Sequence, residues 1–543
     1  MPANRGSTGR AEHGLAAALW AVSGVTLLSR LGGLARDVLL VHLFGATAVG
    51  SAFATAFAIP NLFRRLFGEG ALAAAFIPAY ARARAAGQDE AGRLASLTLL
   101  ALGAVTGGVT VVLELGLLAA LWALPTDPQR DLSLRLIMVM LPFMPLICIA
   151  ATLAGVLQVH GRFGPASSGP LLLNGLIIIV GAYHLATGRA GDARVAYALG
   201  GATVLSGLTQ TAYFLWLLRG RLGLTRRVGP AAPAARTMLR RFVPVMVGLG
   251  TLQLNALLDQ VIAMWPIWVG PTVLGRAYPL DEASAAIIAF TQRLYQFPLG
   301  VFGIAVATAV FPLLARHQDE PASFAGVLRR GVRLSLFIGL PASAGLWLVR
   351  DDLTAVLFSS RSSGFDAQGL ARSAAVLGGY APAVWAYSLN HVLARAFYAR
   401  GDTLTPTRVA LGAMVLNLAL NLVLIWPLRE AGMAWATSLA ATAQCAVLIG
   451  MARRRLGVRA LDREGARGVA RVVLAVAGMS VAVGLVVWAV PASSWGWRAA
   501  RLAGGVGAGG LAYLALAWAC RLPELGWLLA GKPRAAPAPA ETP

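Results

Sequence analysis

Long apolar stretches alternate with short polar segments from residue 15 to residue 520. Most stretches hold about 18 or more predominantly apolar residues, the length that a helix needs to cross the hydrocarbon core of a bilayer. The pattern therefore predicts about fourteen transmembrane helices. They are expected at residues 15–43, 47–80, 95–124, 134–158, 169–187, 194–219, 239–268, 284–315, 329–349, 371–399, 407–428, 430–451, 468–490 and 499–520.

Composition agrees with an all-α polytopic membrane protein. Of the 543 residues, 57% are hydrophobic and only 13% are charged, whereas a soluble protein carries about 25% charged residues. The first apolar stretch is preceded by no A-x-A-like cleavage site, so we expect a retained helix and not a signal peptide.

Arginine lies mainly in alternate connections. The connections 82–93, 219–241, 316–333 and 453–471 are rich in it, and the intervening ones are poorer and more acidic. By the positive-inside rule, this asymmetry places both termini in the cytoplasm. The net charge of +23 lies mostly in these loops, which argues against nucleic-acid binding.

An internal repeat appears at a shift of about 240 residues. Pro142 and Gly161 in one copy correspond to Pro382 and Gly401 in the other. Such a shift spans six helices and preserves their orientation, so it predicts two parallel six-helix lobes with a substrate site between them. The expected parts are a cytoplasmic N-terminus (1–14), an N-lobe (15–219), a basic cytoplasmic linker (220–238), a C-lobe (239–451), helices thirteen and fourteen (452–521) and a disordered cytoplasmic tail (522–543).

Arginines inside the first apolar stretch are the first candidates for function. Arg30 lies near the middle of this stretch and Arg36 lies further along it. An arginine at the centre of a span costs about 2.5–3.5 kcal/mol to insert and normally faces the bundle interior or a wet cavity. A structural alternative for Arg36 is a snorkelling side chain paired with Asp37.

The second stretch holds the adjacent pair Arg64 and Arg65. Neighbouring residues of a helix point in different directions. Glu69 is four residues after Arg65, so we expect an Arg65–Glu69 pair that leaves Arg64 for the substrate. A purely structural Arg–Glu clamp is the alternative.

Arg293 lies in the eighth stretch, in the second lobe. Several guanidinium groups around one cavity would repel one another unless an anion joined them, and guanidinium binds phosphate oxygens in a bidentate manner. The arginines therefore indicate a pyrophosphate or another multi-anionic head group.

A smaller polar set could hold a hard cation such as Na⁺. Asp259 lies in the seventh stretch, Asn417 and Asn421 share one face of the eleventh, and Thr437 lies in the twelfth. Carboxylate, amide and hydroxyl oxygens suit such an ion. Hydrogen bonds between helices are the structural alternative.

Other motifs point to no catalytic chemistry. The three cysteines and six histidines show no metal-ligand spacing, and there is no nucleophile elbow. The run GGVGAGG (504–510) has no strand or lysine context, so helix packing is expected in place of phosphate binding. We expect a transporter, not an enzyme, with no cofactor apart from the candidate sodium ion.

With these residues established, three segments resemble the MurJ/MviN family, the lipid II flippases of peptidoglycan synthesis, within the multidrug/oligosaccharidyl-lipid/polysaccharide exporter superfamily. They read SRLGGLARDVLLVHLFGA…AFAIPNLFRRLFGEGALAAAFIP, RLYQFPLGVFGIAVATAVFP and YSLNHVLARAFYARGDTLTPT. The resemblance covers the chain in order.

The resemblance implies an alternating-access flippase that carries lipid II, an undecaprenyl-pyrophosphate-linked disaccharide-pentapeptide, across the bacterial inner membrane. The family's cavity residues would be Arg30, Arg36, Arg64, Arg293 and Glu69. Its sodium site would comprise Asp259, Asn417, Asn421, Thr437 and the carbonyl of Met433. Helices thirteen and fourteen would form a groove for the polyprenyl tail, and the cell-wall synthesis machinery would be a partner.

The chain departs from the family pattern at several acidic positions. Ser51, Gln292, Gln296 and Asn421 stand where many or some members carry an acid. These departures leave ion coupling open.

Three alternatives accompany this reading. A related polysaccharide-lipid flippase or a drug exporter would use the same fold, although exporters of cationic drugs would not need several cavity arginines. An intramembrane lipid-linked-sugar transferase would need an acidic metal-binding motif or a base–nucleophile pair. A scaffold without transport activity would not need the arginines.

Overall fold

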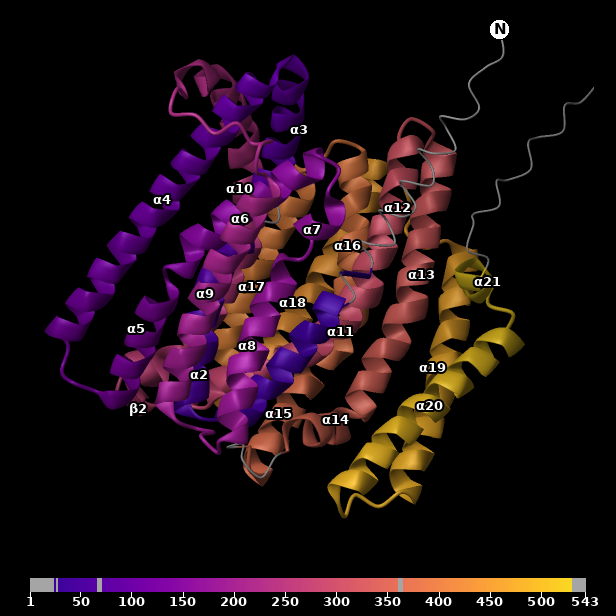
Figure 1. Ribbon diagram of the computed structural model, residues 1–543. Coiled ribbons are helices and arrows are strands. Elements are labelled where there is room, and N and C mark those ends of the chain that lie inside the picture. The colour runs from indigo at the N-terminus through magenta and orange to yellow at the C-terminus, as the bar shows by residue number, and fades with distance from the viewer. Residues whose placement is uncertain (1–23, 26–27, 66–70, 360–364, 530–543) are drawn as a thin grey trace, which may run out of the picture. The chain divides into compact units, whose positions relative to one another are not determined.

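The computed structural model describes residues 24–25, 28–65, 71–359 and 365–529, which are overwhelmingly helical (Figure 1). Over the described part, the chain forms two compact units. Unit 1 comprises Met1–Phe290 with Phe358–Gly369, and unit 2 comprises Thr291–Leu357 with Leu370–Pro543.

Unit 1 begins with a helix over residues 28–44. Its other helices are α2 (Ala48–Phe63), α3 (Ala71–Ala86), α4 (Gln88–Ala123), α5 (Pro128–Met140), α6 (Phe143–Val159), α7 (Phe163–Ala166), α8 (Gly169–Ala186), α9 (Ala193–Leu217), η2 (Gly229–Ala231), α10 (Ala232–Trp268) and the first half of α11 (Ser284–Pro298). A short antiparallel hairpin of β1 (Thr272–Val273) and β2 (Arg276–Ala277) joins α10 to α11.

Unit 2 continues from the second half of α11. Its elements are η3 (Leu299–Gly303), α12 (Ile304–Arg316), α13 (Pro321–Leu348), most of α14 (Arg350–Phe358) and of α15 (Ala367–Tyr380), η4 (Ala381–Ala383), α16 (Val384–Ala399), α17 (Leu404–Leu428), α18 (Glu430–Met451), η5 (Ala452–Leu456), α19 (Arg463–Ala489), α20 (Trp495–Ala519) and α21 (Pro523–Leu529).

Each of the expected spans overlaps one described helix or a series of two or three consecutive ones. Within the described residues, eight helices are long and apolar enough to cross a membrane, and α2 and α12 are shorter apolar helices. A total of about fourteen spans stays a prediction.

Prolines at equivalent places in the repeat interrupt equivalent helices. Pro142 lies between α5 and α6, and Pro382 lies in η4 between α15 and α16. Proline lacks a backbone N–H and its ring clashes with the preceding turn, so a helix breaks there. The expected spans 134–158 and 371–399 are therefore each built from two helices.

The compact units differ from the expected lobes. We expected the boundary at the linker 220–238, but α10 and the start of α11 belong to unit 1. Helix α10 packs against α2, α3 and α4, and Gln260 Nε2 donates a hydrogen bond to Thr55 Oγ1 at 2.6 Å. These contacts attach the seventh span to the helices that precede the linker.

The expectation of a disordered tail from residue 522 is wrong for residues 523–529, which form α21. The buried Glu524 carboxylate accepts a hydrogen bond from Arg333 Nε of α13 at 2.5 Å. The Arg333 guanidinium also lies 5.1 Å from the centroid of the Trp527 ring. An ion pair and an aromatic contact thus hold the helix, and residues 530–543 lie outside the described part.

Glycines allow the last two long helices, α19 and α20, to pack side by side (Figure 1). Gly505 and Gly509 are buried one turn apart on α20. A Cβ atom at Gly509 would lie 2.6 Å from a methyl group of Val483 on α19. The run GGVGAGG is therefore a helix-packing surface, as expected, of the kind that small residues provide in membranes.

The tight connection between α17 and α18 yields a stability prediction. A Cβ atom at Gly432 would lie 2.2 Å from the backbone oxygen of Leu424. We expect Gly432→Ala to lower the free energy of unfolding by about 1–3 kcal/mol, because backbone atoms cannot rotate away as a side chain can. Thermal unfolding of the purified protein measures this.

Gly412→Ala is the matched control. Gly412 lies within α17 and has no atom within 4 Å of a built Cβ atom. Alanine there should leave the melting temperature unchanged or raise it, because glycine disfavours a helix by about 0.5–1 kcal/mol. Equal melting temperatures for the two variants would contradict the close-approach argument.

Candidate functional site

Arg30 lies on the first described helix, residues 28–44, and its side chain is exposed. Within the described residues, the structure records no hydrogen bond or ion pair for its guanidinium. A cation in an apolar helix needs either water or an anion near it. Arg30 is therefore available to a ligand.

Arg36, one and a half turns further on, is buried, and its guanidinium nitrogens donate hydrogen bonds within the protein. Its Nε and Nη2 atoms donate to Asp37 Oδ1 at 3.0 and 2.7 Å, and Nη1 donates to Asn174 Oδ1 of α8 at 2.9 Å. The guanidinium carbon lies 5.1 Å from the centroid of the Phe57 ring on α2. The expected pair with Asp37 is present, although the side chain is buried against Asn174, and a direct role in substrate binding stays a prediction.

Asn174 is a residue whose role the sequence did not reveal. Its Nδ2 atom donates to the backbone oxygen of Ser29 at 3.1 Å, while its oxygen accepts from Arg36. One amide thus contacts the first helix at two points seven residues, or about two turns, apart. The available signal was its position, because Asn174 follows Pro142 in the repeat much as Asn417 follows Pro382.

Arg64 and Arg65 follow directly on α2 and differ in exposure. Arg64 is half-buried, and its Nε atom donates to Asn61 Oδ1 at 3.0 Å. Asn61 in turn donates to the backbone oxygen of Phe57 at 2.9 Å. Arg65 is exposed. The expectation that the two point in different directions stays a prediction, and Glu69 with its expected pair to Arg65 lies outside the described residues.

Arg293 is half-buried on α11. Its Nη1 atom donates to Gln296 Oε1 at 3.4 Å. Gln296 is a neutral amide, so this contact does not neutralise the guanidinium charge.

The arginines divide between the two units. Arg30, Arg36, Arg64 and Arg65 belong to unit 1, and Arg293 belongs to unit 2. Their convergence on one chamber therefore stays a prediction.

Ser51 has a structural role at one of the departures from the family pattern. Its side chain is fully buried, and its Oγ atom accepts a hydrogen bond from the backbone nitrogen of Ala286 at 2.9 Å. Ala286 lies in the first turn of α11, where helical N–H groups have no partner within the helix. Ser51 thus caps α11 from a neighbouring helix.

The candidate sodium ligands of unit 2 lie together on α17 and α18. Asn421 Nδ2 donates to Asn417 Oδ1 at 3.1 Å, and Asn417 Nδ2 donates to Thr437 Oγ1 at 3.1 Å. Thr437 Oγ1 donates to the Met433 backbone oxygen at 2.9 Å. Asp259 lies in unit 1, where it accepts from Asn255 Nδ2 at 3.2 Å.

This donor set fits a hard monovalent cation. It offers amide, hydroxyl and carbonyl oxygens on the two adjacent helices α17 and α18, and Na⁺ prefers oxygen ligands. The same atoms also satisfy one another as interhelical hydrogen bonds, so the structural alternative accounts for the geometry equally well.

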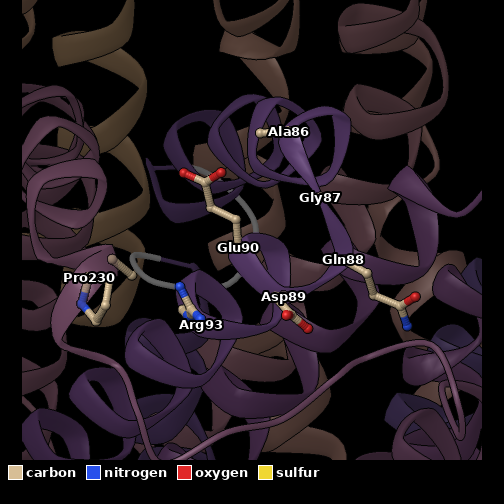
Figure 2. Close-up of a pocket in the computed structure, with 8 residues that line it drawn as sticks. Ala86, Gly87, Gln88, Asp89, Glu90, Arg93 and Pro230 are labelled. Atoms are coloured by element: carbon tan, nitrogen blue, oxygen red, sulfur yellow. The ribbon is translucent and has the colours of Figure 1, made fainter.

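A polar cavity opens at the start of α4 and involves none of these residues. It is lined by Ala86–Glu90, Arg93, Pro230 and Ala231. Figure 2 shows Glu90 and Arg93, from the first two turns of α4, beside Pro230. Two carboxylates against one guanidinium do not favour an anionic ligand, so this cavity is not the candidate site.

Comparison with known proteins settles the family. The family model of the lipid II flippase MurJ matches residues 40–500. The chain belongs to the lipid II flippase MurJ family.

Two relatives illustrate the similarity of this MurJ-family chain. A probable lipid II flippase MurJ of Vibrio cholerae is 32% identical over 519 residues, which cover 91% of this chain and 94% of the relative. One of Rhizobium tropici is 31% identical over 432 residues, which cover 77% of each chain.

Solved structures share the fold of this MurJ-family protein. A lipid II flippase MurJ in an inward closed conformation matches with a TM-score of 0.71 at 19% identity, over 92% of this chain and 98% of the other. An inward-facing multidrug resistance MATE family transporter of the MOP superfamily matches with a TM-score of 0.66 at 16% identity, over 81% and 98%. The chain is thus a multi-pass helical membrane protein of this fold.

The contact between Arg36 and Asn174 yields a second prediction. Asn174→Leu removes an acceptor from a buried guanidinium and should cost about 1.5–3 kcal/mol of stability. Thermal unfolding checks this, with Tyr183→Phe as the control on the same helix, because the Tyr183 side chain is exposed. If Asn174→Leu unfolds at the wild-type temperature, Asn174 does not hold the first helix.

Proposed function

We propose that this MurJ-family protein moves lipid II from the cytoplasmic to the periplasmic leaflet of the bacterial inner membrane by alternating access. In this proposal both termini lie in the cytoplasm, and the protein is a transporter and not an enzyme. The observation that carries the proposal is Arg30, an exposed guanidinium in an apolar helix without a recorded partner among the described residues.

The chemistry of lipid II matches these arginines. Its pyrophosphate presents several oxygens with negative charge, and guanidinium groups donate parallel hydrogen bonds to such oxygens. Arg30, Arg64 and Arg293 would share the pyrophosphate, and Arg36 would position the first helix. A cationic drug would be repelled by the same groups.

Family membership supports the substrate. The curated relatives are named lipid II flippases and probable lipid II flippases. The structural likeness extends to a drug transporter of the same superfamily, so the fold by itself does not choose between substrates. The cationic side chains favour the anionic lipid over a drug.

Helices α19 and α20 would receive the polyprenyl tail. Val473, Val481 and Leu485 on α19, and Leu511 on α20, are exposed apolar side chains. Isoprenoid units gain free energy by contact with such a surface. We also propose the cell-wall synthesis machinery as a partner that uses the translocated lipid.

We further propose that Na⁺ binds through Asp259, Asn417, Asn421, Thr437 and the carbonyl of Met433. The oxygen donors on α17 and α18 support this proposal. An ion bound there would link helices eleven and twelve to helix seven and could couple transport to an ion gradient.

Arginine variants test the proposed function. In a strain depleted of its own lipid II flippase, the wild-type chain should clear lipid II from the cytoplasmic leaflet. Arg30→Ala, Arg64→Ala and Arg293→Ala should each fail or lose about tenfold in rate, because each removes charge-assisted hydrogen bonds. Protease or toxin accessibility of periplasmic lipid II provides the measurement.

Arg194→Ala is the control for these variants. Arg194 is an exposed arginine at the start of α9, outside the candidate site. It should support growth at the wild-type level. Full rescue by all three site variants at equal expression would refute the arginine mechanism.

A sodium titration tests the ion proposal. Replacing K⁺ by Na⁺ at constant ionic strength should raise the melting temperature of the purified protein, because an ion that binds only the folded state adds about 2.7 kcal/mol at a hundredfold excess over its dissociation constant. Thr437→Val and Asp259→Asn should each abolish the shift. If the sodium-dependent rise in melting temperature persists in Asp259→Asn, Asp259 is not a ligand of the ion. If the wild type shows no such rise, the proposed sodium site is refuted.

A further inference from the structure

Helix α16 (Val384–Ala399) leaves one polar line of side chains accessible. Most of the helix is buried against α12, α13 and α18. Tyr387 and Arg395 are half-buried, whereas His391 and Tyr398 are exposed. The spacing of four, four and three residues places these side chains on one face. We call Tyr387, His391, Arg395 and Tyr398 the α16 stripe.

The composition of the α16 stripe does not suit contact with lipid. The exposed surface of α19, for comparison, carries apolar side chains such as Val473, Val481 and Trp488. The α16 stripe instead carries a guanidinium, an imidazole and two phenols. Ionisable residues within spans face the bundle interior or a water-filled space.

The two basic residues of the α16 stripe, of which Arg395 carries the permanent charge, lack an acidic partner in the described part of the chain. Neither His391 nor Arg395 has a recorded hydrogen bond or ion pair there. The Arg395 guanidinium instead lies 6.0 Å from the centroid of the Phe311 ring on α12. The stripe is therefore complementary to an anion.

The repeat shows that the fold does not require this stripe. At a shift of 240 residues, the equivalent positions on α6 are Ile147, Ala151, Gly155 and Gln158. Gly155 is buried, and a Cβ atom there would lie 3.3 Å from Ile77 of α3. The first copy uses this face for packing, so the fold itself does not call for Arg395 and His391 at these positions.

The α16 stripe begins next to the element that carries Arg293. The Tyr387 ring stacks on Tyr295 of α11 with centroids 5.5 Å apart, and Tyr295 also stacks on Tyr380 at 4.5 Å. Arg293 precedes Tyr295 by two residues. At about 1.5 Å per residue, Arg395 lies about 12 Å along α16 from Tyr387.

We propose that His391 and Arg395 form a second oxyanion-binding contact for the head group of the translocated lipid, in addition to the candidate arginines. This inference rests on the proposed function. Two parts of lipid II present the required oxyanions, the pyrophosphate and the carboxylates of the peptide. The stripe extends the cationic surface along α16, so the head group keeps a partner as it moves past Arg293.

Binding to the full-length protein in phosphatidylcholine nanodiscs tests the inference. The probes are lipid II, lipid II with amidated peptide carboxylates, and undecaprenyl pyrophosphate. The variants are His391→Gln, Arg395→Gln and Arg293→Gln. Arg408→Gln, at an exposed arginine on the first turn of α17 in the same unit, is the matched control.

We expect His391→Gln and Arg395→Gln to weaken binding by about tenfold, as the loss of a charge-assisted hydrogen bond would. Weaker binding of all three probes assigns the contact to the pyrophosphate, and weaker binding of unmodified lipid II alone assigns it to the carboxylates. Arg395→Lys keeps the charge and should recover part of the affinity. Unchanged melting temperatures would exclude misfolding as the cause.

Three results would overturn the inference. The first is that His391→Gln and Arg395→Gln bind every probe with wild-type affinity while Arg293→Gln binds weakly. That result would refute the head-group contact at the stripe and leave the proposed function intact. An equal loss of probe affinity in Arg408→Gln would show a general effect of removing positive charge. If the stripe variants instead differ from the wild type only in nanodiscs to which phosphatidylglycerol has been added, the stripe binds bulk anionic lipid. If the wild type binds none of the probes, the proposed function itself fails.

Discussion

The cost of holding a guanidinium group inside an apolar helix governs this structure. An arginine in a span is stable only if acceptors, water or a ligand surround it. In the described part of the chain, some arginines obtain acceptors from the protein and others are left accessible. That difference separates side chains that hold the fold from side chains that are suited to an anion.

Three arginines, of which Arg36 is buried and Arg333 and Arg501 are half-buried, obtain acceptors from the protein. Arg36 is shared between Asp37 and Asn174. Arg333 joins α13 to the buried Glu524 of α21. Arg501 of α20 donates from Nε to Asp352 of α14 at 2.7 Å. Removing one partner of such a pair leaves a buried charge, so these contacts act as joints between helices. Arg30 and Arg395, by contrast, are left accessible to water or a ligand.

The two copies of the internal repeat share their helix-breaking prolines but differ in the contacts of the asparagines that follow. Pro142 and Pro382 interrupt corresponding helices in the two copies. The asparagines that follow them serve different contacts, since Asn174 holds Arg36 and Asn417 bonds to Thr437. Proline acts through its own ring and missing N–H, so its effect is local and repeats wherever it occurs. An asparagine depends on what the neighbouring helices place beside it.

The sequence was enough to predict a polytopic helical protein with helices at the expected positions. The signals for it are the length of the apolar stretches, the arginine pattern and the repeated prolines, and each of these is local to the chain. The sequence did not show that Asn174 holds Arg36 or that Ser51 caps α11, since the residues involved are far apart in the chain. It also missed α21, because the contacts of this seven-residue helix come from Arg333, which lies far away in the sequence on α13. Burial and hydrogen bonding between distant helices are properties of packing, which only the tertiary structure decides.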